Sequence, residues 1–126
     1  MQSWLLILYV ANATLLIVHE IDSAYWQEWK LFKLPGGAAF FLALHIPLVA
    51  VVLLGLLYLT WGWTAGLIIS AILGLGGIFA FAIHMTFISR GRSEFKTASS
   101  LAVLWATLIV SLVQLALSAY AMATGA

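Results

Sequence analysis

Four long apolar stretches, separated by three short connectors, constrain this chain more than any other feature. They run over residues 3–20, 37–59, 63–88 and 97–122. Each holds about 18–26 residues, and a helix of that length, rising ~1.5 Å per residue, crosses a hydrocarbon core of ~30 Å. The runs are continuous, unlike the alternating segments of a transmembrane barrel. The sequence therefore predicts an all-α, four-helix transmembrane bundle that forms one domain over residues 1–126.

The composition agrees with a chain that lies almost entirely in lipid. Of 126 residues, 65% are hydrophobic and 7% are charged, whereas a soluble domain carries roughly 25% charged residues. We therefore expect a multi-pass protein of the cell (inner) membrane with lipids as its partners. The absence of cysteine excludes disulfides and cysteine-held metal sites. A net charge of +1 with no basic patch excludes nucleic acid as a partner.

The three connectors differ in kind. The first, IDSAYWQEWKLFKLPGG, carries charges and aromatic residues at helical spacing and ends in a turn around Pro35, Gly36 and Gly37. It predicts either a continuation of the first helix or a short interfacial helix on the cytoplasmic side. The second connector, TWGW, predicts a tight hairpin, and the third, SRGRSEFK, is polar and short.

The positive charges of the chain lie in the first and third connectors only. With four spans, these two connectors share one side of the membrane, which the positive-inside rule makes cytoplasmic. Both termini are then expected on the non-cytoplasmic side. The residues concerned are Lys30, Lys33, Arg90, Arg92 and Lys96.

Polar residues inside the spans tend to face the bundle interior. The fourth span carries a stripe of four: Thr107, Ser111, Gln114 and Ser118. The stripe predicts interhelical hydrogen bonds, with the lining of a pore or substrate cavity as the alternative. Glycines of the third segment (Gly62, Gly66, Gly74, Gly76 and Gly77) predict close helix packing. A surplus of small residues there also predicts a homo-oligomer.

Three histidines lie on three different predicted helices. Counted at ~1.5 Å per residue from the nearer connector, His19, His45 and His84 all fall in the cytoplasmic half. Imidazoles and carboxylates converging from separate helices are what a metal site in a bundle requires. The sequence predicts metal ligands His19, His45, His84 and Asp22, catalytic residues Glu20, Asp22 and Glu28, and zinc or iron as the divalent transition metal.

Helical geometry favours one acid as the partner of His19. Asp22 lies three residues further on and shares its face, whereas Glu20 points ~100° away. Asp22 or Glu28 has a second possible role, holding a ligating imidazole in the correct tautomer. A polar network with no ligand and a proton path are the competing interpretations of the same residues.

Several functions fit these residues. The first is a metal-dependent or acid/base enzyme acting on a lipid-like small molecule. The second is an electron-transfer protein with His45 and His84 as axial haem ligands. A proton or ion transporter and an accessory subunit of a membrane complex are the other two.

The stretch HEIDSAYWQEW, residues 19–29, is followed by Leu31-Phe32 and an LPGG turn. It resembles a family of small, uncharacterised bacterial membrane proteins whose hallmark is HEID, a W-x-E-W cluster and LPGG. The resemblance covers the whole chain and implies a four-helix bundle. It also adds weight to His19, Glu20, Asp22 and Glu28 as functional residues, and it implies no particular reaction.

Overall fold

A computed structural model describes residues 1–125 of the chain as an all-α protein. Four helices are long and apolar enough to cross a membrane. The predicted fold class is confirmed. The elements are α1 (Gln2–Tyr25), α2 (Glu28–Leu31), α3 (Gly37–Thr60), α4 (Thr64–Ser89) and α5 (Ala98–Thr124).

The first connector contains both of the structures predicted for it. α1 continues past Glu20 to Tyr25, and a one-turn helix, α2, follows it. Gln27 separates the two with a left-handed φ of 54°. Residues other than glycine rarely take this backbone conformation. At Gln27 it reverses the direction of the chain, so that α2 folds back over the end of the bundle.

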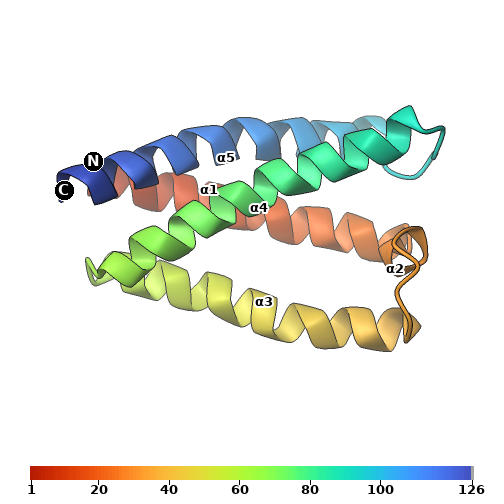
Figure 1. The fold of residues 1–126 in the computed structure, drawn as a ribbon, viewed down its shortest axis with the longest axis horizontal. Coiled ribbons are helices and arrows are strands. Elements are labelled where there is room, and N and C mark those ends of the chain that lie inside the picture. The colour runs from red at the N-terminus through yellow and green to blue at the C-terminus, as the bar shows by residue number, and fades with distance from the viewer. Residues whose placement is uncertain (126) are drawn as a thin grey trace.

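The two ends of the bundle have different contents (Figure 1). Both termini and the turn between α3 and α4 lie at one end, here called the terminal end. The opposite end holds α2 and the connector between α4 and α5, and is called the charged end. The lysines and arginines of the chain all lie in these two connectors. The two connectors meet at one end because successive long helices run in opposite directions.

Close packing of α4 depends on positions without a side chain. A Cβ on Gly77 would collide with the Ser111 hydroxyl of α5, and one on Gly66 would collide with the backbone of Leu59 in α3. The close packing predicted for these two glycines is confirmed. Gly76 has nothing within 4 Å of an added Cβ, so the same prediction was wrong there, because the residue faces away from the bundle.

A fully buried hydrogen-bond network, here called the central network, joins α1, α4 and α5. Asn12 Nδ2 donates to Gln114 Oε1 at 2.8 Å, and Ser111 Oγ donates to Asn12 Oδ1 at 3.1 Å. Gln114 Nε2 donates to the hydroxyl and carbonyl oxygens of Ser70, and Ser118 Oγ donates to Ser70 Oγ at 2.8 Å. The interhelical bonding predicted for the stripe on the fourth span is confirmed for Ser111, Gln114 and Ser118, whereas Thr107 Oγ1 donates to the Val103 carbonyl of its own helix.

α3 is the least buried of the long helices. Only Phe41, Gly55 and Leu59 are buried along it. Its attachment to α1 includes the Tyr9 hydroxyl, which donates to the Val52 carbonyl at 2.6 Å. Most of its apolar surface faces outward, as expected for a helix whose solvent is lipid. α3 therefore forms one edge of the bundle.

Candidate functional site

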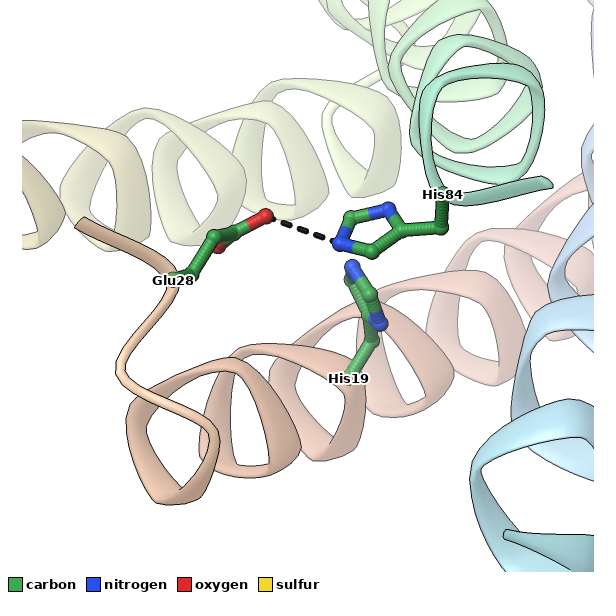
Figure 2. A group of neighbouring side chains, drawn as sticks. All are labelled: His19, Glu28 and His84. Atoms are coloured by element: carbon green, nitrogen blue, oxygen red, sulfur yellow. Dashed lines mark ion pairs between the residues drawn. The ribbon is translucent and has the colours of Figure 1, made fainter. Parts of the chain in front are cut away.

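A buried group of three side chains lies at the charged end. His19 comes from α1, Glu28 from α2 and His84 from α4. One ligand atom from each lies within 4.8 Å of the other two, so the group could hold a metal ion. Figure 2 shows the three side chains pointing toward one another from their separate helices. We call this group the His–Glu–His cluster.

Local structure explains how Glu28 reaches the cluster. The reversal at Gln27 starts α2 with Glu28 in its first turn, so that the side chain faces back into the bundle. Leu31, on the same short helix, is buried against Leu104 and Phe95 and anchors α2. A carboxylate from a connector is thus only 8% exposed, despite lying outside the long helices.

The orientation of His84 is set by its own helix. Nδ1 lies 2.7 Å from the Ala80 carbonyl oxygen, and because a carbonyl only accepts, Nδ1 carries the proton. Nε2 faces Glu28 Oε1 at 2.9 Å, so a ring with a single proton points its Nε2 lone pair at the carboxylate. Two acceptors at this distance repel each other unless a proton or a cation lies between them.

The contact between His84 and Glu28 is not a well-formed hydrogen bond. The contact is short, but Nε2 has no hydrogen-bond partner with acceptable geometry among residues 1–125. Burial acts to raise the pKa of the Glu28 carboxyl, but the neighbouring His84, His19 and Ser23 outweigh it and lower that pKa below its usual value. Glu28 is therefore a carboxylate at neutral pH, as a metal ligand must be.

His19 packs at right angles to His84. Their ring centroids lie 4.6 Å apart with an interplanar angle of 89°. Figure 2 shows the ring nitrogen farther from the backbone, Nε2, directed toward His84 and Glu28. The other nitrogen, Nδ1, is buried and has no hydrogen-bond partner in the described part of the chain.

Aromatic side chains close the cluster off. The Phe95 ring lies 4.2 Å from the His84 ring and 5.8 Å from the His19 ring, and Phe95 is only 1% exposed. The ring of Phe32, which follows α2 directly, has its centroid 6.4 Å from that of the His84 ring. Sequence reasoning missed Phe95, although a signal existed, since it is the one large apolar residue in the polar connector SRGRSEFK.

His45 and Glu20 form a second pair. His45 Nε2 lies 2.6 Å from Glu20 Oε2, and His45 Nδ1 lies 2.6 Å from the Phe41 carbonyl oxygen. This pair joins α3 to α1, and both side chains are partly exposed. The structure thus places His45 and Glu20 against each other rather than in the His–Glu–His cluster. It leaves no free ring nitrogen on His45 for the predicted metal or haem.

Asp22 occupies the turn of α1 after His19. Its Oδ1 accepts a hydrogen bond from Trp26 Nε1 at 3.1 Å, and its Oδ2 is buried without a partner within residues 1–125. Asp22 is not among the three residues whose ligand atoms converge. The acid that joins His19 in the cluster is Glu28 and not Asp22 as predicted, because the reversal at Gln27 brings the acid of the connector inward.

The donor set of the cluster suits a transition metal. Zinc bonds to imidazole nitrogen and carboxylate oxygen are ~2.0–2.2 Å long, so donor atoms around a tetrahedral ion lie roughly 3.3 Å apart. The His84 Nε2–Glu28 Oε1 distance of 2.9 Å is already shorter than this separation, and all three ligand atoms lie within 4.8 Å of one another. Two imidazoles and one carboxylate leave a further coordination position for water or substrate.

The chain also matches one known family. Residues 5–121 match the family of unknown function DUF6713. The chain belongs to this family. No curated protein and no solved structure matches it significantly.

Membership in DUF6713 agrees with the resemblance noted in the sequence on two points: the match covers most of the chain, and the family has no assigned function. It supplies no reaction and no ligand.

Proposed function

We propose that this DUF6713 protein is a metalloprotein of the membrane that holds one divalent transition metal, zinc or iron, on His19, Glu28 and His84. The observation that carries the proposal is the convergence of three buried ligand atoms within 4.8 Å. Lone pairs that face one another in a buried site repel unless a proton or a cation lies between them. A metal ion satisfies all three side chains at once.

The chemistry follows from the coordination that such a set leaves open. A zinc ion on two histidines and a glutamate lowers the pKa of bound water to about 7 and polarises carbonyl groups, and a ferrous ion on the same set has positions for oxygen and substrate. The site lies at one end of four apolar helices. A substrate with an apolar body that dissolves in the bilayer fits this location best.

We further propose that the protein catalyses a reaction at this metal, with the His45–Glu20 pair as its acid/base group. The pair is partly exposed between α1 and α3, whereas the cluster is closed by aromatic rings. A charged or strongly polar pair at the surface of membrane helices is costly and marks a functional site. Its position lets it contact a substrate that enters from the lipid.

The test is the metal content of the purified protein. We expect about one equivalent of zinc or iron in the wild-type protein by inductively coupled plasma mass spectrometry, and a loss of at least tenfold in His84→Ala and Glu28→Gln. His45→Ala is the matched control, because it removes a histidine at the same end of the bundle that lies outside the cluster, and it should retain the metal. Wild-type protein that stays metal-free after incubation with Zn²⁺ or Fe²⁺ would refute the proposal.

We also propose that the charged end faces the cytoplasm, which places both termini outside it. The support is the gathering of the lysines and arginines in two connectors at one end. Terminal fusions to a periplasmic reporter such as alkaline phosphatase should be active. Activity of fusions to a reporter that works only in the cytoplasm would reverse the orientation.

A further inference from the structure

Buried polar atoms without partners gather in one place. Among residues 1–125, buried side-chain atoms that have no hydrogen-bond partner belong to four residues: His19 (Nδ1), Asp22 (Oδ2), Ser23 (Oγ) and His84 (Nε2). Two of these residues belong to the His–Glu–His cluster, and the other two follow His19 on the next turn of α1. Native proteins pair nearly all such atoms, so a concentration of exceptions calls for a common cause.

We infer that Asp22 and Ser23 are the positioning residues of the metal site, with Asp22 holding His19 and Ser23 holding Glu28. The inference rests on the proposed function, because it describes the site in its metal-bound form. One ion then accounts for all four atoms: it takes Nε2 of His84 directly, and it fixes His19 and Glu28 in positions where Asp22 and Ser23 can bond to them.

The case for Asp22 is chemical complementarity. Nε2 of His19 points into the cluster, so a ring that binds metal there carries its proton on Nδ1. Nδ1 is then a buried donor without an acceptor, and Asp22 Oδ2 is a buried acceptor without a donor. Asp22 follows His19 by three residues in one helix, which places the two side chains on the same face.

Trp26 supplies the other half of the arrangement. Its indole Nε1 donates to Asp22 Oδ1 at 3.1 Å, which holds the carboxylate by one oxygen and leaves the second free. Metal-bound histidines commonly donate their other N–H to a carboxylate that is itself hydrogen-bonded. The same order, from outer donor to carboxylate to histidine to metal, is formed here by Trp26, Asp22 and His19, which lie in α1 and at its C-terminal end.

Ser23 stands in the same relation to Glu28. Its side chain is fully buried, and Ser23 follows His19 by four residues in α1, so the two side chains lie on the same face of that helix. No bond to Glu28 is formed in the structure, since Ser23 Oγ has no partner among residues 1–125. A Glu28 carboxylate drawn onto a metal ion needs a donor for its second oxygen, and the Ser23 hydroxyl is the donor at hand.

The test measures metal affinity and ligand field in the full-length protein. We expect Co²⁺, used as the probe, to bind the wild-type protein with visible absorption bands typical of a four- or five-coordinate site. Asp22→Ala should weaken Co²⁺ binding by about 10–100-fold, the usual effect of losing an outer partner of a ligand, and should shift the bands. Asp22→Asn keeps an acceptor oxygen and should restore part of the affinity, and Ser23→Ala should show a smaller loss.

Glu94→Gln is the control, because it changes an acid at the same end of the bundle that pairs with Arg92 instead. It should leave Co²⁺ affinity and spectrum unchanged. Wild-type affinity and bands in both Asp22 variants would overturn the inference while leaving the proposed function intact. Absence of Co²⁺ binding in the wild-type protein would overturn both. If Asp22→Ala does not fold, Asp22→Asn alone decides, since an affinity and spectrum equal to wild type contradict the inference.

Discussion

Two buried polar regions of this DUF6713 protein differ in how completely they are paired. In the central network, five fully buried residues satisfy one another across three helices: Asn12, Ser70, Ser111, Gln114 and Ser118. At the charged end, the region around the His–Glu–His cluster holds every buried side-chain atom that lacks a partner in the described chain.

This difference distinguishes a region that is complete by itself from one that could hold a ligand. A closed network needs nothing from outside and holds transmembrane helices together. Buried polar atoms without partners cost free energy, which a bound ligand could offset. Buried polarity alone therefore does not suggest a site in a membrane bundle, whereas unsatisfied buried polarity is a reason to look for one.

The largest expected effect tests the packing beneath the central network. Gly77→Val should destabilise the bundle by about 1–3 kcal/mol or more, the usual range for overpacking, because its Cβ would collide with the Ser111 hydroxyl. Gly76→Val is the matched control on the neighbouring position, where an added Cβ meets nothing within 4 Å. Thermal unfolding in mild detergent should show a clear drop for the first variant only. Equal drops would mean that α4 and α5 do not pack as described.

A smaller effect should separate the two polar regions directly. Gln114→Leu strands its partners Asn12 and Ser70 and should lower stability by roughly 1–2 kcal/mol, since membrane hydrogen bonds contribute ~0.6 kcal/mol on average and ~1.7 at most. Ser23→Ala should leave the metal-free protein as stable as wild type or more so, because it removes a buried hydroxyl that has no partner within residues 1–125. Unfolding of metal-free samples by denaturant measures both. A loss in Ser23→Ala as large as in Gln114→Leu would contradict the difference between the two regions.

The smallest effect belongs to the connector between α4 and α5. Arg92 donates to Glu94 at 2.8 Å, and this contact lowers the pKa of the Glu94 carboxyl. A group whose pKa is lowered on folding stabilises the protein above its unfolded pKa and loses that contribution as the pH falls through the lowered value. Because the pair is exposed to water, Glu94→Gln should cost ~0–1 kcal/mol at neutral pH and nothing in acid. Melting curves at both pH values check the sign, and a loss that persists in acid would contradict this assignment.

Much of the fold was predictable because each helix satisfies its own backbone hydrogen bonds in lipid. Apolar length alone predicted four spans, and their observed bounds differ from the predictions by at most two residues, except that α1 runs on to Tyr25. The inward direction of the polar stripe on the last span was predictable as well, because polar side chains are costly in lipid and tend to face the bundle interior. Pro35 and Gly36 predicted the turn that ends the first connector.

The sequence by itself determined how far along its helix each polar residue lies, because that distance is counted in residues along the chain. Only the tertiary structure decided which residues meet, because the rotation of each helix depends on packing against the others. It set His84 against His19 and His45 against Glu20. It also brought Glu28 into the cluster through a left-handed Gln27, a backbone choice that side-chain spacing does not encode and that burial of Leu31 in the bundle stabilises.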